Sequence, residues 1–168
     1  NVTSFEVSNS PDLTAIHSPV TATVMTKYSA NLNDITGTLN VSGLSGLGGI
    51  FNVQQNANLS AITLPTSTQT FSAFKINICP ALGYVDLTTL TNLTESAFCG
   101  IDIDNNGLTA AEVNHFLVDL DAMSTGGFGF RSINIGGSNA APDGSSGGYD
   151  GTTAKANLIT KTFSVSTS

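Results

Sequence analysis

Large apolar side chains recur along this chain at every twenty-third position. One series of such residues has four members: Phe5, Tyr28, Phe51 and Phe74. A second series follows two positions later: Val7, Ala30, Val53 and Ile76. A third series keeps the same spacing: Ile16, Leu39, Ile62 and Val85. A fixed period of this length indicates stacked repeats, and such stacks usually present a binding surface.

The local pattern predicts what each repeat contains. Apolar residues at positions i and i+2 predict a short strand with one buried face. The third series predicts a second extended segment, since so short a repeat leaves no room for a helix as well. After each first strand, a polar or small residue turns the chain and can bond buried backbone groups; this position holds Ser10, Asn33, Asn56, Cys79, Asn106 and Ser138. The glycine-rich segment Ser42–Gly49 predicts a loop.

The full repeat unit reads Met25-x-x-Tyr28-x-Ala30-x-x-Asn33, and variants of it recur over residues 2–138. This unit resembles that of the leucine-rich repeat family, L-x-x-L-x-L-x-x-N/C-x-L. The resemblance implies a β-rich solenoid with about 23 residues per coil. The segments Ile35–Leu39 and Gly46–Gly49 are also similar to parts of surface or phage-encoded repeat proteins of Bacteroidetes-type bacteria.

The pattern changes at residue 109. Thr109 and Glu112 form a capping-box sequence that predicts a helix start. Apolar residues then recur at helical spacing, at Val113, Phe116, Leu117 and Leu120. Further elements are predicted in order: a helix end at Gly126-Gly127, a strand at Ile133–Ile135, a loop at Gly136–Gly151, a short helix near Thr153–Thr160 and an edge strand at Phe163–Ser166.

These elements predict an α/β C-terminal cap on the solenoid. We therefore expect residues 1–108 to form the leucine-rich repeat coils and residues 109–168 to form the helix-containing last repeat and the cap. Both belong to one continuous domain. Because the first repeat has no polar or helical cap, we expect this domain to be the C-terminal part of a longer chain.

Composition narrows the possible setting and partners. Only 10% of the residues are charged, against about a quarter in an average soluble domain, and Ser, Thr, Asn and Gly take the polar positions. This composition suits extracellular repeat proteins. The net charge is −7 with only five Lys and Arg, which argues against nucleic-acid and anionic-membrane partners. No apolar run is long enough to predict membrane insertion.

The cysteines and histidines predict neither a disulfide nor a metal site. Cys79 follows its strand and Cys99 precedes its own, so stacking should hold them too far apart to bond. We expect two free, largely buried thiols. His17 and His115 each lack a second ligand at metal-binding spacing, and His115 is expected on the solvated side of its helix, beside Asn114.

One acidic segment resembles a calcium site. Asp102-x-Asp104-x-Asn106-Gly107 is similar to the start of an EF-hand loop, which needs a Glu at its twelfth position. Here Glu112 comes one residue early, which rotates its carboxylate by about 100° on a helix. The repeat and the capping box account for these residues, so we predict no metal. Weak calcium binding near Asp102 and Asp104 remains the alternative.

Catalytic motifs are absent from the sequence. No serine has the Gly-x-Ser-x-Gly context of a nucleophile elbow, and no Lys-Ser or Lys-Thr pair follows Gly46–Gly49 to complete a phosphate loop. Asp102 and Asp104 have no apolar pocket evident around them that would raise one pKa. We predict that the chain is not an enzyme and uses no cofactor.

The side chains between the buried strand positions form the candidate binding surface. They are Glu6, Ser29, Asn52, Lys75, Asp102, Asp104 and Asn134. We predict a non-enzymatic recognition or adhesion module, extracellular on a cell or virion surface, that binds a polar protein or glycan. The chain has no Trp to stack on a sugar, and the face could instead be merely soluble. The alternative function is a structural subunit that assembles end to end through its uncapped N-terminal repeat.

Overall fold

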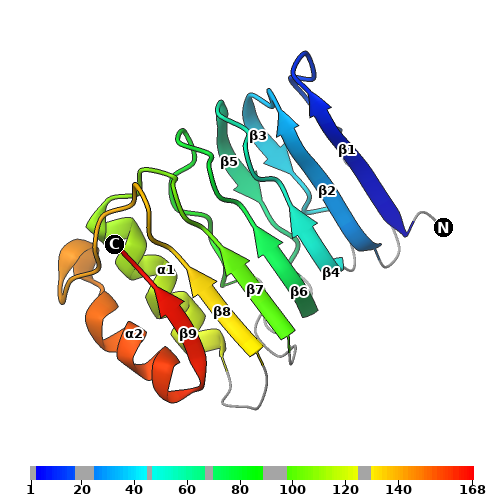
Figure 1. Cartoon of the computed structure of the whole chain (residues 1–168). Coiled ribbons are helices and arrows are strands. Elements are labelled where there is room, and N and C mark those ends of the chain that lie inside the picture. Colours follow the sequence, from blue (N-terminus) through cyan, green and yellow to red (C-terminus); the bar gives the residue numbers. More distant parts are fainter. Residues whose placement is uncertain (1–2, 18–24, 45–46, 67–69, 89–97, 125–129) are drawn as a thin grey trace.

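The chain is wound as a β-solenoid of parallel strands with two helices (Figure 1). The computed structural model describes residues 3–17, 25–44, 47–66, 70–88, 98–124 and 130–168. The predicted solenoid architecture is therefore confirmed. The strands of the large sheet follow one another in chain order across Figure 1, from β1 near the N-terminus to β9 at the C-terminus.

Seven parallel strands form the large sheet, each taken from a successive turn of the chain. In order they are β1 (Ser4–Ser10), β2 (Met25–Asn33), β4 (Leu47–Asn52), β6 (Thr70–Lys75), β7 (Phe98–Asp102), β8 (Phe130–Asn134) and β9 (Phe163–Ser166). The register of the first four strands aligns the residues that the sequence places one repeat apart. The sequence separation between paired residues then exceeds one 23-residue repeat: Phe74 pairs with Ile101, and Ile101 pairs with Ile133.

A smaller sheet of two parallel strands closes the other side of two coils. It consists of β3 (Gly37–Asn40) and β5 (Leu59–Thr63), with Leu39 opposite Ile62. The prediction is right for these two segments, whereas Ile16 and Val85 lie in non-strand segments. In Figure 1 the two strands lie behind the N-terminal half of the large sheet.

The prediction of a loop over Ser42–Gly49 is wrong at its end, because β4 begins at Leu47. Gly49 pairs with Phe71 of β6 and has a φ of +71°. A Cβ at this position would lie 2.3 Å from the carbonyl oxygen of Thr26. The glycine therefore allows a close strand approach here and does not mark a loop.

Stacked aromatic rings fill the core of the N-terminal coils. The ring centroids are 5.0 Å apart between Phe5 and Tyr28, 5.6 Å between Tyr28 and Phe51, and 5.3 Å between Phe51 and Phe74. Tyr28, Phe51 and Phe74 are fully buried, and Phe5 is half-buried at the end of the stack. The repeat period thus places like rings on like rings, at distances that favour aromatic contact.

Buried asparagines join successive coils. The Asn56 Nδ2 donates to the carbonyl oxygens of Ala30 and Val53, each at 2.8 Å, and its Oδ1 accepts from the Ile35 amide at 3.4 Å. The same contact with the preceding coil recurs along the stack. We call this set the asparagine ladder: Asn33, Asn56, Asn106 and Asn139. Each ladder residue satisfies backbone groups of the preceding coil that would otherwise be buried without partners.

The last member of the ladder corrects one prediction. The sequence pattern places Ser138 at the turn position, but Asn139 fills it and donates to the carbonyl oxygens of Ile103 and Ile135, both at 3.0 Å. One extra residue enters this turn through Gly136-Gly137, and Gly137 has a φ of +72°. Ser138 instead accepts a hydrogen bond from the Gly107 amide at its hydroxyl.

The capping box at the start of α1 (Ala110–Met123) is confirmed. Thr109 is the N-cap, and its amide donates to Glu112 Oε2 at 2.9 Å. The four apolar residues predicted at helical spacing are all buried. The helix ends at Met123, before the predicted Gly126-Gly127, which lies outside the described residues.

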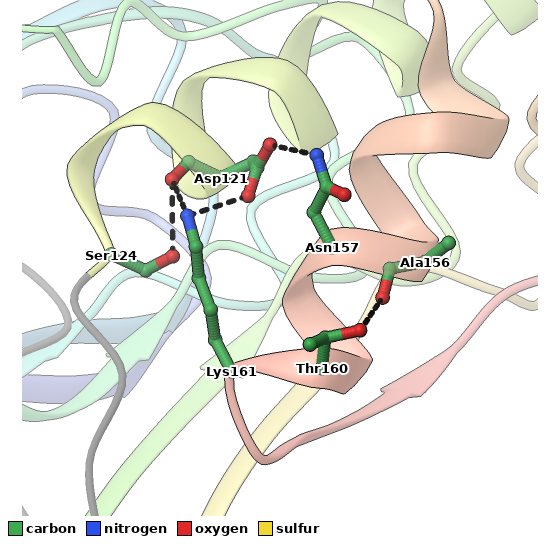
Figure 2. A network of polar contacts seen from close by, with 6 residues as sticks. All are labelled: Asp121, Ser124, Ala156, Asn157, Thr160 and Lys161. Carbon is green, nitrogen blue, oxygen red and sulfur yellow. Dashed lines mark hydrogen bonds and ion pairs between the residues drawn. The ribbon is translucent and has the colours of Figure 1, made fainter.

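The end of the chain folds as predicted, with a short helix followed by an edge strand. A single turn, η1 (Ser146–Gly148), precedes α2 (Gly151–Thr160), and β9 then pairs in parallel with β8. Polar contacts join α2 and the residue after it to the last turn of α1 (Figure 2). Lys161 Nζ contacts Asp121 at its carboxylate, 2.7 Å away, and at its carbonyl oxygen, while Asn157 Nδ2 donates to the same carboxylate at 2.9 Å.

Candidate binding surface

The outward side chains of the large sheet form one continuous polar row. The strand register aligns Glu6, Ser29, Asn52, Lys75, Asp102, Asn134 and Ser166. Six of these are residues that the sequence assigns to the candidate surface, and Asp104 follows just beyond the end of β7. We call this row and its neighbours on the same side the exposed strand face.

Two ion pairs cross the exposed strand face. Lys75 Nζ lies 3.1 Å from Asp102 Oδ2, with side chains 37% and 27% exposed. Lys27 Nζ lies 2.8 Å from Glu6 Oε2. Lys27 is not among the residues predicted from the sequence, and it aligns with Ser4 in the adjacent outward row. Exposed pairs of this kind contribute at most about 1 kcal/mol, so these charges can exchange partners readily.

Ser29 differs from its prediction, because it is buried with only 3% of its surface exposed. Its hydroxyl donates to Asn31 Oδ1 at 2.8 Å, and longer side chains, Glu6 and Asn52, flank it in the row. Ser29 therefore contributes to the packing of the face rather than to contact with a partner. Asn52 is half-exposed and accepts a hydrogen bond from the Gln54 amide at 3.2 Å.

A second polar row lies just beyond the carboxyl ends of the strands. Backbone hydrogen bonds align Gln54, Asn77, Asp104 and Gly136 along it. Within the described part of the chain, Asn77 Oδ1 is buried and has no hydrogen-bond partner. A buried acceptor without a donor is costly, by about 1–3 kcal/mol.

The residues of the calcium-like segment are engaged in other roles. Asn106 belongs to the asparagine ladder, Asp102 pairs with Lys75, and Glu112 caps α1. Burial raises the pKa of Glu112, but hydrogen bonds from Thr109 and the Tyr84 backbone outweigh it and leave the pKa lowered. The described residues contain no group of three or more His, Cys, Asp or Glu placed to hold a metal ion.

Cys79 takes the ladder position of its coil and is a free, buried thiol, as predicted. Its Sγ lies 3.5 Å from the Val53 carbonyl oxygen and 3.6 Å from that of Asn77. Burial raises the pKa of this thiol. A protonated, enclosed thiol is a poor nucleophile. The prediction for Cys99 concerns a side chain outside the described ones.

His115 is not the solvated side chain that the sequence predicts. Its ring stacks between two tyrosines, with centroids 3.8 Å from Tyr84 and 4.0 Å from Tyr149. The rings are nearly parallel, at 6° and 13°. Neighbouring Asn114 is fully buried, so this side of α1 packs against other segments of the chain, and 26% of the His115 side chain stays exposed. We call this stack the tyrosine–histidine clamp.

A buried carboxylate lies beside the clamp. The Tyr84 hydroxyl donates to Asp119, and His115 Nε2 lies 3.8 Å from Asp119 Oδ1. Burial raises the pKa of Asp119 despite the Tyr84 hydrogen bond, and burial together with Asp119 raises the pKa of Tyr84. The two tyrosine rings cover both faces of the imidazole. The arrangement holds three segments together.

Local sequence reasoning could not have found the clamp. Tyr84 and Tyr149 are both distant from His115 in the sequence, and neither separation matches the repeat period. The only signal is compositional, because two of the three tyrosines of the chain fall outside the core aromatic series.

Comparisons with protein-family models, with curated proteins and with solved structures found no match. No helix in the described ranges is both long and apolar enough to cross a membrane. The geometry of the chain itself is therefore the basis for assigning it a function.

Proposed function

We propose that this chain is a non-enzymatic recognition or adhesion module, displayed outside the cell or on a phage virion, that binds a polar protein or glycan through the exposed strand face. The observation that carries the proposal is the in-register polar row across seven parallel strands. Its spacing is set by the sheet, so a partner meets a rigid and repetitive array of amides, hydroxyls and paired charges.

We also place the solenoid in the leucine-rich repeat class, with the α1–β9 region as its C-terminal cap. The asparagine ladder supports this placement, because Asn33, Asn56 and Asn106 occupy the Asn or Cys position of the repeat and bond the preceding coil. Cys79 fills the same position in its own coil. The longer, helix-containing final coils are what a terminal repeat needs in order to cover the core.

The test is binding of the labelled chain to a defined glycan array and to an array of purified bacterial surface proteins. The face variant carries Asn52→Ala, Lys75→Ala and Asp102→Ala. The control variant carries Asn58→Ala, Lys155→Ala and Asp12→Ala, which removes the same residue types outside the face. We expect the face variant to bind at least about tenfold more weakly, equivalent to about 1.4 kcal/mol, while the control binds like the unmodified chain.

Circular dichroism and thermal unfolding establish that both variants are folded. Equal loss in the face and control variants would mean that removal of charge, not the face, governs binding. Full binding by a folded face variant would place the interaction elsewhere on the molecule.

A second function, end-to-end assembly, is favoured by one specific observation. The aromatic stack ends at Phe5, which is half-buried while the next three rings are fully buried. A further coil placed against β1 would complete the burial, whether that coil comes from another copy or from additional chain. Concentration-dependent polymers in sedimentation would support assembly. A monomer over the whole accessible concentration range would exclude it for this chain.

A further inference from the structure

A cleft of about 450 Å³ lies beside β3, remote from the exposed strand face. One wall is the segment Ala15–His17 of the first coil, and the other wall runs from Ile35 to Gly43. The cleft exists because these two segments separate. The Thr36 amide donates to the Thr14 carbonyl oxygen at 2.9 Å, but no further backbone hydrogen bond continues this pairing among the described residues.

Within the part of the chain that the structure describes, the edge of β3 that faces the first coil has no paired strand. The N–H groups of Gly37 and Val41 point toward β5 and donate to the carbonyl oxygens of Asn58 and Thr63. The N–H group of Thr36 points the opposite way, toward the first coil. Alternate residues of a strand present their backbone groups to opposite neighbours. The N–H and C=O groups of Thr38 and Asn40 therefore face the first coil, where the cleft lies. An open strand edge of this kind is a template for another strand.

The cleft also has a defined chemical character. Alternate outward side chains line its β3 wall: Thr36, Thr38, Asn40 and Ser42. Ile35 is buried beneath them, and Ile16 is only half-buried, whereas its equivalents Leu39 and Val85 are buried. Among the described residues that line the cleft, His17 is the one ionisable side chain, and there is no Asp, Glu, Lys or Arg. The site therefore suits an uncharged ligand with backbone-like donors and acceptors and apolar side chains to cover Ile16.

We propose that this cleft binds an extended, uncharged peptide that adds to β3 as a parallel strand. The internal repeat indicates the peptide's chemistry, because β3 itself lies along β5 in this way, with Leu39 opposite Ile62. A peptide that enters the cleft between β3 and the Ala15–His17 segment would present to β3 what β3 presents to β5. Main-chain hydrogen bonds would supply its affinity, and alternate side chains its specificity.

The probe is a synthetic peptide with the sequence of residues 35–43, Ile-Thr-Gly-Thr-Leu-Asn-Val-Ser-Gly, blocked at both ends. Two further peptides carry one backbone N-methyl group each. Methylation at the position copied from Leu39 removes an N–H that should face β3. Methylation at the position copied from Thr38 removes an N–H that should face solvent. The two modified peptides are otherwise matched in composition and in added bulk.

We expect saturable binding of the unmodified peptide to the full chain, with a Kd of about 10–100 μM by calorimetry. The Leu39-position methyl should weaken binding at least about tenfold, whereas the Thr38-position methyl should change it less than about threefold. In the protein, Asn40→Arg should block the cleft. Thr63→Arg is the matched control, because Thr63 is the exposed register partner of Asn40 on β5 and lies outside the cleft.

Several outcomes would overturn the proposal. Equal effects of the two methyl groups would rule out strand addition, and so would unchanged binding by a folded Asn40→Arg variant. Absence of binding up to about 1 mM peptide would rule out a peptide site. Loss of a glycan-array signal in Asn40→Arg, without peptide binding, would assign the cleft to a neutral glycan instead. Because the face variant leaves the cleft intact, failure of the strand-face proposal would not affect this test.

Discussion

The N-terminal and C-terminal halves of this solenoid are held together in different ways. From β1 to β6 the coils are nearly identical in length, and each repeats the contacts of its neighbour, ring on ring and asparagine on backbone. From β7 onward the coils are longer and two helices appear, and contacts between particular side chains are added to the asparagine ladder, which continues through Asn106 and Asn139. Repetition spreads stability over many equivalent sites, whereas individual contacts concentrate it at a few.

The largest effect should come from breaking the ladder in the repetitive half. Asn56→Ala leaves the Ala30 and Val53 carbonyl oxygens and the Ile35 amide without their side-chain partner, in a position that is fully buried. We expect a loss of about 3 kcal/mol in the free energy of unfolding. Urea unfolding followed by circular dichroism measures this loss.

The control for this change is Asn58→Ala, an exposed asparagine whose one described side-chain hydrogen bond is to the Asp34 carboxylate. It should cost less than about 0.5 kcal/mol. Asn56→Cys, which copies the residue at Cys79, should cost less than Asn56→Ala because a thiol can still contact the carbonyl oxygens. Equal stability of Asn56→Ala and Asn58→Ala would show that the ladder does not join the coils.

The corresponding change in the C-terminal half is Asn114→Ala. Asn114 Nδ2 donates to Asp143 Oδ1 at 2.8 Å and to the Tyr149 carbonyl oxygen at 3.0 Å, and its Oδ1 accepts from the Asp143 amide at 3.0 Å. We expect a loss of about 2 kcal/mol, slightly below that of Asn56→Ala. Hydrogen exchange should accelerate locally in the segment from Asp143 to Tyr149, because the Asn114 side chain joins this loop to α1.

Hydrogen exchange also separates the two halves from each other. Asn56→Ala should raise exchange over several adjacent coils, since each coil covers the next. A uniform increase over the whole chain in Asn114→Ala would contradict the local role of that contact.

Asp143 gives the C-terminal half a dependence on pH. Hydrogen bonds from the Ser146 hydroxyl, from the Ser145 and Ser146 amides and from Asn114 hold the pKa of Asp143 well below its usual range. Because the folded pKa lies below the unfolded value of about 3.9, the carboxylate stabilises the fold above that pH and loses this contribution as the pH falls. Thermal unfolding should show Asp143→Asn to be less sensitive to pH than the unmodified chain between about pH 5 and 2.

Asp119 should behave in the opposite way, which makes it a useful comparison. Burial raises the pKa of Asp119 in the folded state. Its protonated form therefore contributes to the stability of the fold below the unfolded pKa, and this contribution is lost as the pH rises through the folded pKa. Asp119→Asn should therefore flatten the pH dependence above about pH 4. The same pH profile for both variants would contradict these assignments.

The difference between the halves also explains which contacts were predictable. The aromatic stack followed from a period, because a translation by one repeat brings Phe5, Tyr28 and Phe51 into line. The contacts of Asn114 and His115 follow no period, since their partners lie in loops well away in the sequence. The capping box was predictable because all of its groups lie within four consecutive residues.

The candidate surface was predictable to the same extent. The alternation of a strand selected Asn52, Lys75 and Asp102, which the structure leaves partly exposed. It could not show that Ser29 would be covered, because exposure depends on the length of side chains on neighbouring strands. It could not locate Asn139 either, because one extra residue in the Gly136-Gly137 turn shifts the register of the ladder by one.

The smallest predicted effect concerns the turn residues just before Asn33, Asn56, Cys79 and Asn106. These residues adopt positive φ, at 57° for Leu32, 60° for Gln55, 57° for Ile78 and 59° for Asn105. The left-handed conformation disfavours a β-branched residue most and tolerates Asn best. Ile78 is 41% exposed, so little burial is lost on substitution. We expect Ile78→Asn to stabilise the chain by about 0.5–1 kcal/mol, as measured by urea unfolding.

The matched change is Asn105→Ile, which introduces the unfavourable residue where the chain now has a favourable one. It should destabilise by a similar amount plus the loss of the hydrogen bond from the Ser138 amide to Asn105 Oδ1, 3.2 Å long. If Ile78→Asn is neutral while Asn105→Ile is costly, the side-chain bond and not the backbone conformation governs these turns. Ile78 would then adopt its positive φ without strain. The turn at Ile78 would differ from the turn at Asn105 only in lacking the side-chain hydrogen bond.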